Sequence, residues 1–270
     1  DTIVVDNHSS DDSVSRIRAA FPNVTLIESE ANLGFTGGNN LGLRHALATD
    51  ASYIMLLNND TIVAPDMFDI MVDVMEKDPT IGVSGPMIYF YDAPDTIWSI
   101  AGRIDWKTGT TSMVGLYEQD NGQYGTGPHE ADFITGCALL VRREVWEKAG
   151  LLDDNFFIYY EETEWCVRAS RAGFRIVYIP DAMMWHKIPL EARASSSWAY
   201  YYMTRNRLLF LRKTQVGLRT WLNVGTEYVR TFASWTLRPK WRDRRHLRSL
   251  MFRAIKDFYA GNYGQTLRKA

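Results

Sequence analysis

The first sixty residues alternate between runs that suit strands and runs that suit helices. Three runs rich in β-branched and apolar side chains favour buried strands: "TIVV" (2–5), "NVTLIES" (23–29) and "SYIMLL" (52–57). Helical patterns at 14–21 and 34–48 separate them. Such alternation predicts parallel strands joined by helical crossovers, with ligands beyond the carboxyl ends of the strands. We therefore expect an α/β fold with a mostly parallel sheet flanked by helices.

The rest of the chain extends this pattern and then becomes helical. Further elements are predicted as helices at 66–77 and 159–172, strands within 81–91 and at 174–180, an irregular or hairpin-rich stretch at 101–130, and a strand plus short helix at 131–150. From about Ser195 the pattern is helical and rich in Trp, Tyr and Arg, with a breaker at Pro239. We expect one α/β domain at 1–194 and a helical extension at 195–270.

Charge divides the chain unevenly. Residues 216–270 carry 12 basic and three acidic side chains, while the rest carries 18 and 29. The basic part mixes Arg with apolar residues at spacings that permit amphipathic helices on an anionic membrane surface, although the same helices could pack on the body with only Arg solvated. No nucleic acid is expected, because "RDRRHLR" is short and the body is acidic.

Membrane-spanning segments and disulfides are not expected. No run approaches the roughly 18 apolar residues that span a bilayer. Cys137 and Cys166 match no metal-ligand spacing, so both are interpreted as reduced, buried side chains. These features predict a cytoplasmic protein, which would be peripheral at the inner face of the plasma membrane if the basic C-terminal helices bind lipid.

Polar residues follow two of the predicted strands. Asp60 closes "LLNND" after an apolar strand, where its carboxylate could bind a divalent cation or form an Asx turn. Asp6, followed by Asn7, ends "TIVV" and could accept from a ribose hydroxyl or a pyrimidine N–H, or cap a helix. His186, beyond the last predicted strand, is a candidate metal ligand or a partly buried imidazole.

The stretch "NLGFTGGNN" (32–40) places adjacent glycines at a helix entry. Gly38, Asn39 and Asn40 stand where backbone could approach a ligand closely and N–H groups could face phosphate. The spacing is neither GxGxxG nor a P-loop, so it indicates a binding loop only weakly.

An acidic cluster follows the aromatic run "FFIYY". Glu164 can pair with Arg168 on a helix surface, since the two are four residues apart. That leaves Glu161 and Glu162 among large apolar side chains, where burial raises a carboxyl pKa and suits it to act as a general base.

Taken in order, five motifs resemble family 2 glycosyltransferases of the rhamnosyltransferase-like branch over residues 1–212. They are "VVDNHSSDDS", "NLGFTGGNN", "LLNNDT", "FITGCALLVRREVWEKAGLLDDNFFIYYEETEWCVRASRAGF" and "YIPDAMMWH". The resemblance implies a GT-A fold and inverting, hexosyltransferase-type transfer in cell-surface polysaccharide assembly. The implied donor is a dTDP- or UDP-sugar, with rhamnose one candidate sugar, and the implied acceptor is a glycan or polyprenyl-diphosphate-linked hydroxyl.

The resemblance also implies roles for individual residues. Glu162 corresponds to the family's catalytic base, with Glu161 as its rival, and Asp60 with His186 would hold Mg²⁺ or Mn²⁺. Asp6 would contact the base of the nucleotide. The other implied nucleotide-sugar residues are Asn7, Gly38, Asn39, Asn40, Asn59, Asp60, Arg205 and Asn206, the last two facing the diphosphate or an anionic acceptor.

Two alternatives to this function remain at the level of sequence, and one segment of the family pattern has no counterpart. The alternatives are a non-catalytic module that binds sugar nucleotides or glycans, and a nucleotidyltransferase. The family's usual first strand-helix unit is not matched, so we expect it to be missing from the N-terminal side of this chain.

Overall fold

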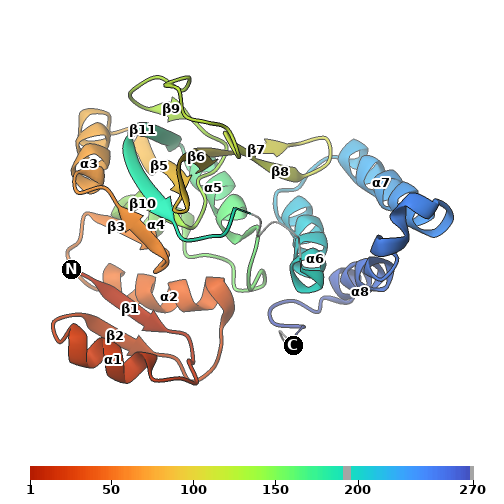
Figure 1. Ribbon diagram of the computed structural model, residues 1–270, viewed down its shortest axis with the longest axis horizontal. Helices are drawn as coiled ribbons and strands as arrows, with labels where there is room; N and C mark the ends of the chain where they lie inside the picture. Colours follow the sequence, from red (N-terminus) through yellow and green to blue (C-terminus); the bar gives the residue numbers. More distant parts are fainter. Residues whose placement is uncertain (191–195, 268–270) are drawn as a thin grey trace.

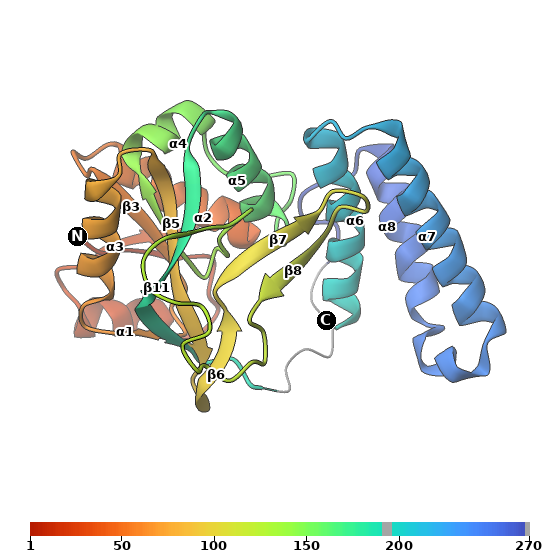
Figure 2. The ribbon, with the colours of Figure 1, turned by 90° about the horizontal axis from the view of Figure 1, so that it is seen from above.

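The computed structural model describes residues 1–190 and 196–267, which form an α/β body with a group of helices at one side (Figure 1, Figure 2). The strands are β1 (Ile3–Asp6), β2 (Thr25–Glu28), β3 (Tyr53–Leu57), β4 (Thr61–Val63), β5 (Ile81–Phe90), β6 (Ala93–Ser99), β7 (Ala101–Asp105), β8 (Thr110–Val114), β9 (His129–Glu130), β10 (Ala138–Arg142) and β11 (Arg175–His186). The helices are α1 (Ser13–Ala20), α2 (Gly34–Leu47), α3 (Met67–Lys77), α4 (Arg143–Ala149), α5 (Glu161–Arg171), α6 (Ser197–Lys213), α7 (Leu218–Leu237), the 3₁₀ helix η1 (Pro239–Arg244) and α8 (Leu247–Ala260).

The main sheet has the central strand order β3-β10-β5-β11-β4, with β6 beside β5 and β9 beside β11. The α/β class with flanking helices is confirmed, but the strand directions differ from the prediction. Strand β5 is parallel to β11, as expected for strands joined by helices, whereas β10 lies antiparallel between β3 and β5. Strands β4, β6 and β9 are also antiparallel to their neighbours. The sheet is mixed because loops and hairpins, rather than helices, lead into these strands.

Strand β10 shows how the sheet divides the core. Its alternate residues point to opposite faces, as they must in a strand. Leu139 and Val141 join the core beneath α4 and α5, where the Trp146 and Trp165 rings lie 4.0 Å apart. Ala138 and Leu140 join the core beneath α3, which contributes Met67, Met71 and Met75. Because the sheet is packed against helices on both faces, the ends of its strands are held in fixed positions.

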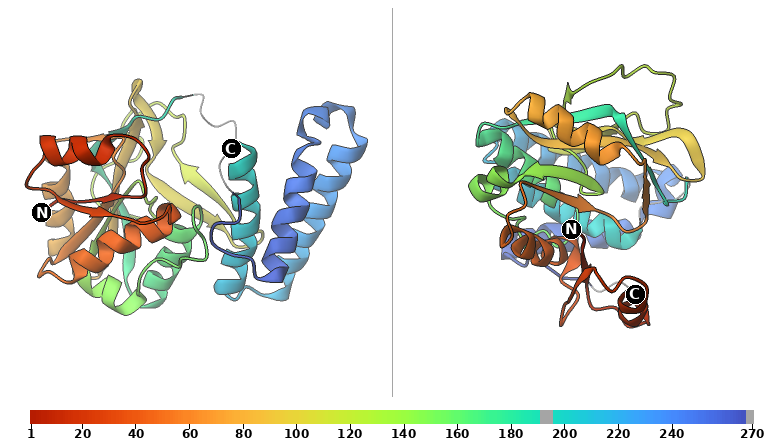
Figure 3. Two further views of the ribbon diagram at one scale, coloured as in Figure 1. Left: turned by 90° about the horizontal axis from the view of Figure 1, so that it is seen from below. Right: turned by 90° about the vertical axis from the view of Figure 1, so that its left-hand side faces the viewer.

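Strands β1 and β2 form a separate parallel pair, with α1 and α2, at the end of the body farthest from α7 (Figure 3). The run "TIVV" was predicted as a buried strand, but Ile3, Val4 and Val5 are only half-buried. The reason is that β1 has a hydrogen-bonded neighbour on one side alone within the described residues.

Two element boundaries differ from the prediction. The glycine-rich stretch is not a loop, because α2 already begins at Gly34. The last strand does not end near residue 180 but continues to His186, since its register shifts between Ile179 and Met183 and pairing with β5 then resumes. His186 therefore lies on a strand, opposite Thr61 of β4.

The C-terminal helices pack side by side, with α7 outermost (Figure 2). They contact the body through the β7–β8 turn: the Thr220 hydroxyl donates to the Trp106 carbonyl at 2.9 Å, and Arg207 donates to the Thr108 carbonyl at 2.8 Å. The predicted division at 194/195 lies outside the described residues. In the described part of the chain, no helix is both long enough and apolar enough to cross a bilayer.

Candidate functional site

Glu161 and Glu162 form the first turn of α5. The helix begins directly after Tyr160, whose φ of 72° lies in the left-handed region, so the chain turns sharply into the helix. The Glu161 side chain is buried, and its Oε2 has no hydrogen-bond partner among the described residues. Glu162 is only half-buried, which leaves its carboxylate the more accessible of the two.

Burial shifts both carboxyl groups in the same direction. It raises the pKa of Glu162 above the ordinary glutamate value of 4.5. It raises the pKa of Glu161 further, and the neighbouring Glu162 charge adds to that effect. Two neighbouring carboxylates resist double ionisation, and the pKa of the more buried Glu161 is raised further than that of Glu162.

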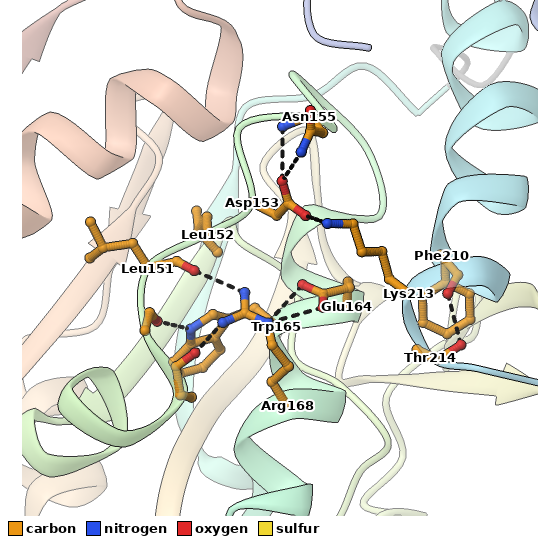
Figure 4. Close-up of polar contacts among 12 residues, drawn as sticks. Leu151, Leu152, Asp153, Asn155, Glu164, Trp165, Arg168, Phe210, Lys213 and Thr214 are labelled. Atoms are coloured by element: carbon orange, nitrogen blue, oxygen red, sulfur yellow. Dashed lines mark hydrogen bonds and ion pairs between the residues drawn. The ribbon is translucent and has the colours of Figure 1, made fainter. Parts of the chain in front are cut away.

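Glu164 is paired with Arg168, as predicted, but the pair is not on the surface. Both carboxylate oxygens accept from Arg168 Nε at 3.0 Å, and the Glu164 side chain is only 6% exposed (Figure 4). Arg168 also donates to the Leu151 carbonyl at 2.8 Å. Glu164 therefore anchors the loop before α5 and is not available as a base.

Asp60 and His186 lie together, although 126 residues separate them. The pairing of β4 with the end of β11 brings the Asp60 Oδ1 to 3.1 Å from His186 Nε2. The imidazole is buried, contacts the edge of Trp98 at a centroid distance of 4.7 Å, and has a pKa lowered by burial, against the opposing effect of Asp60. The Asp60 side chain is 51% exposed. A neutral imidazole nitrogen thus lies beside an accessible carboxylate.

The segment "TGC" connects the glutamates with this pair. A Cβ placed on Gly136 would lie 3.9 Å from the Glu162 Cβ and 2.7 Å from the Phe35 ring. The next residue, Cys137, accepts at its carbonyl from the Asn58 N–H at 2.9 Å, two residues before Asp60. Glu162 and the residues that lead to Asp60 therefore both lie next to one short backbone segment.

The residues after β1 contact the start of α2. Asp6 is buried and accepts from the Ser9 N–H at 3.1 Å. Asn7 accepts from the Leu33 N–H and donates to the Gly34 carbonyl, both at 2.9 Å. A Cβ on Gly38 would lie 3.2 Å from the Asn7 amide. Asn7 therefore joins the end of β1 to the first turns of α2 beside the buried Gly38, while the predicted ligand residue Asp6 is buried at the end of the strand.

The two asparagines of "GGNN" differ. Asn39 is half-buried and donates to the Phe35 carbonyl at 2.8 Å. Asn40 is fully buried and exchanges hydrogen bonds with the Leu152 backbone at 2.9 and 3.1 Å while also donating to Asp154. The prediction of a nucleotide contact is wrong for Asn40, because its amide holds the loop that leads to the glutamates. Asn59 is exposed beside Asp60.

Arg205 and Asn206 do not face an open site. Both side chains are fully buried on α6, and their donors reach backbone carbonyls of residues 155–159. The prediction that they contact a diphosphate or an acceptor is wrong for this structure, because their hydrogen-bonding groups are already used inside the protein.

Sequence reasoning missed three contributors to the site: Gly136, Trp98 and Asp154. Gly136 lies within the quoted motif "FITGC", and its lack of a side chain is explained only by the Phe35 ring across from it. Trp98 contacts His186, which lies 88 positions later in the chain, and Asp154 accepts a hydrogen bond from Asn40, 114 positions earlier. A single sequence does not indicate contacts between residues so far apart.

The arrangement is that of a GT-A glycosyltransferase. The family model "Glycosyltransferase like family 2" matches residues 1–208, and the chain therefore belongs to this family. A similar solved structure is the "Crystal structure of GalNAc-T7 with UDP, GalNAc and Mn2+" (TM-score 0.60, 16% identity, covering 96% of this chain and 50% of that one). At this identity the likeness establishes the fold, and with the family match it confirms the class predicted from the motifs.

Two curated relatives are similar to this chain over most of its length. The chain is 27% identical to the "dTDP-rhamnosyl transferase RfbF" of Shigella flexneri over 80% of its length and 72% of the relative's. It is 26% identical to the "N-acetylglucosaminyl-diphospho-decaprenol L-rhamnosyltransferase" of Mycobacterium tuberculosis (strain ATCC 25618 / H37Rv), over 68% and 65% of the two lengths. The chain thus spans about two thirds of the length of these relatives.

Proposed function

We propose that this chain carries out inverting transfer of a sugar from a nucleotide diphosphate sugar to an acceptor hydroxyl in the assembly of a cell-surface glycan. The observation that carries the proposal is the accessible Glu162 beside the buried Glu161, one backbone segment away from Asp60 and His186. The names of the curated relatives favour dTDP-rhamnose as donor and a polyprenyl-diphosphate-linked acceptor.

The reaction we propose is a direct displacement. Glu162 accepts the proton of the acceptor hydroxyl, whose oxygen forms a bond to the anomeric carbon as the bond from that carbon to the diphosphate oxygen breaks. Burial raises the Glu162 pKa toward the working range of a general base. Glu161, holding its own proton, keeps a second negative charge out of the turn. Asp6, Asn7, Gly38 and Asn39 would line the nucleotide side.

A divalent cation fits Asp60 and His186. A carboxylate oxygen and a neutral imidazole nitrogen suit Mn²⁺, and Mg²⁺ would rely on the oxygen. The described residues contain no cluster of three or more His, Cys, Asp or Glu side chains that could hold a metal, so phosphate oxygens of the donor would complete the ligand set. When bound, such an ion would neutralise charge on the departing diphosphate.

The test compares Glu162→Gln with Glu144→Gln, a change at an exposed glutamate of α4. Release of dTDP is followed with dTDP-rhamnose, Mn²⁺ and a GlcNAc-diphospho-polyprenol acceptor, and dTDP binding is measured by calorimetry. We expect Glu162→Gln to lower turnover by about 10²–10⁴, the usual contribution of general acid–base catalysis, without changing dTDP binding. Glu144→Gln should leave both unchanged.

Other outcomes separate the alternatives. Near-normal turnover of Glu162→Gln would remove Glu162 as the base. A wild-type protein that binds dTDP-rhamnose but neither transfers nor hydrolyses the sugar would support the binding module instead. In wild type, kcat/KM should fall as the pH drops toward the Glu162 pKa, because protonation removes the base.

We also propose that α7 and η1 dock on an anionic membrane surface. Leu218, Leu222, Val229 and Phe232 recur at helical spacing on α7 and are all exposed. Directly after them, η1 and the following residue expose Lys240, Arg242, Arg244 and Arg245. An apolar stripe next to clustered cations suits acidic phospholipid, where a polyprenyl-linked acceptor would also lie.

A further inference from the structure

The turn before α5 has an unusual backbone. Phe157, Tyr159 and Tyr160 have φ values of 67°, 68° and 72°, all in the left-handed region. The left-handed region is unfavourable for side chains of this size, so such residues persist only where their surroundings hold them there. Three of them within four positions, directly ahead of Glu161 and Glu162, need an external support.

Helix α6 supplies that support through Asn206. Its Nδ2 lies 2.8 Å from the Phe156 carbonyl, 2.7 Å from that of Ile158 and 2.9 Å from that of Tyr159. One buried amide thus donates to three carbonyls of the strained turn, and the Phe156 carbonyl also accepts from the Ile158 N–H at 2.8 Å.

Arg205 orients this amide and reaches the same turn. Its Nε donates to Asn206 Oδ1 at 2.9 Å, and its Nη2 donates to the Phe156 carbonyl at 3.1 Å. The guanidinium lies over the Tyr202 ring, which stacks on Phe157. Nη1 donates to the Gly264 carbonyl at 2.8 Å, so the C-terminal segment also helps to fix it.

The support acts through geometry rather than through charge. The pKa values of Glu161 and Glu162 are shifted by burial, by the neighbouring glutamate and by backbone hydrogen bonds. The Arg205 charge does not contribute to either shift. Tyr160, the residue before α5, has no side-chain cap to set the direction of the helix. The direction in which Glu162 points therefore depends on the turn that Asn206 and Arg205 hold.

We propose that Arg205 and Asn206 are positioning residues: together they hold residues 156–160 in the conformation that presents Glu162 to the acceptor. The proposal rests on the proposed function of Glu162 and gives both side chains a task other than ligand contact. Arg207 provides a matched control, because it is buried on the same helix but bonds to Glu227 and the Thr108 carbonyl.

The experiment compares Asn206→Ala, Arg205→Lys and Arg207→Gln in the full chain. For Asn206→Ala we expect kcat to fall about 100-fold, the loss that a misplacement of about 1 Å can cause, with the donor KM and dTDP affinity unchanged. Amide hydrogen exchange should rise in residues 156–164 and stay as in wild type in α3, residues 67–77, which packs on the other face of the sheet. Arg205→Lys should give a smaller change of the same kind, and Arg207→Gln should leave exchange in 156–164 and kcat as in wild type.

The outcomes keep this proposal apart from the proposed function. An Asn206→Ala protein with wild-type exchange in 156–164 and wild-type kcat would overturn the positioning role. So would a loss of dTDP affinity with kcat retained, which would return these side chains to the diphosphate. If wild type transfers no sugar, the exchange comparison still decides whether Asn206 holds the turn.

Discussion

Glu161 and Glu162 are adjacent in sequence yet differ in chemistry. Their spacing could not distinguish them, and only the family register favoured Glu162. The structure supplies the missing quantity, which is exposure: one side chain is buried, and the other is half-buried beside Gly136. Exposure of single residues at a helix start depends on packing from distant segments, so it was not predictable from local sequence. The proximity of Asp60 and His186, in contrast, was implied by the resemblance to family 2 glycosyltransferases, which assigned both residues to one metal site.

The buried Glu161 should make the protein less stable as the pH rises. The Glu161 pKa in the folded state lies above the value of 4.5 that an exposed glutamate has. As the pH rises above 4.5, the unfolded chain therefore releases this proton at a lower pH than the folded chain, which favours unfolding. Glu161→Gln removes that loss. We expect the variant to be more stable than wild type at pH 8, with the difference shrinking toward pH 4. A gain of about 1 kcal/mol would raise the Tm by about 2–4 °C.

Thermal melts of both proteins across pH 4–8 check this expectation. Glu147→Gln serves as the control, because that glutamate is exposed on α4 and pairs with Arg143 of the same helix. A wild type that is as stable as Glu161→Gln at pH 8 would show that Glu161 is ionised in the folded protein.

At the scale of elements, α2 shows where sequence analysis reached its limit. Its glycines were interpreted as a ligand-binding loop, yet Gly34 begins the helix with a φ of 72°. A Cβ there would lie 2.4 Å from both the ring and the carbonyl of Phe157. The glycine is needed because α2 packs directly on the turn before α5, a contact between residues 123 positions apart. Strand and helix types followed from periodicity, whereas such contacts did not.

Gly34→Ala should therefore destabilise the protein by about 2–5 kcal/mol, the sum of a left-handed backbone cost and overpacking. Urea unfolding, followed by circular dichroism, measures the change. Gly225→Ala is the control, since that glycine lies inside α7 with open space around it and the substitution should stabilise the helix by about 0.5–1 kcal/mol. Equal midpoints for the two variants would contradict the packing at Gly34.

At the scale of the whole molecule, the acidic body and the basic C-terminal helices lie at opposite sides (Figure 3). The sequence predicted both the charge division and the amphipathic helices. It could not show which of their faces would remain uncovered, because that depends on how α6 and α8 pack. The structure leaves the apolar stripe of α7 exposed.

This arrangement predicts binding to vesicles that contain phosphatidylglycerol and little binding to phosphatidylcholine vesicles, with the bound fraction falling as salt is raised. Flotation in a density gradient measures it. Leu222→Glu should reduce the bound fraction by introducing a charge into the stripe. Phe21→Glu, at an exposed apolar residue after α1, should not. Equal flotation of these two variants would place the contact elsewhere.

The position of α6 limits how relatives of this chain can be recombined. A chimera that took its C-terminal helices from another protein at the predicted 194/195 division would also exchange the side chains that bond to residues 155–159. The turn before α5 and helix α6 would therefore have to be exchanged together. A junction in the turn between α6 and α7 would keep Arg205 and Asn206 with the carbonyls of residues 155–159, but it would separate Arg205 from the Gly264 carbonyl and Tyr201 from Asp257 of α8.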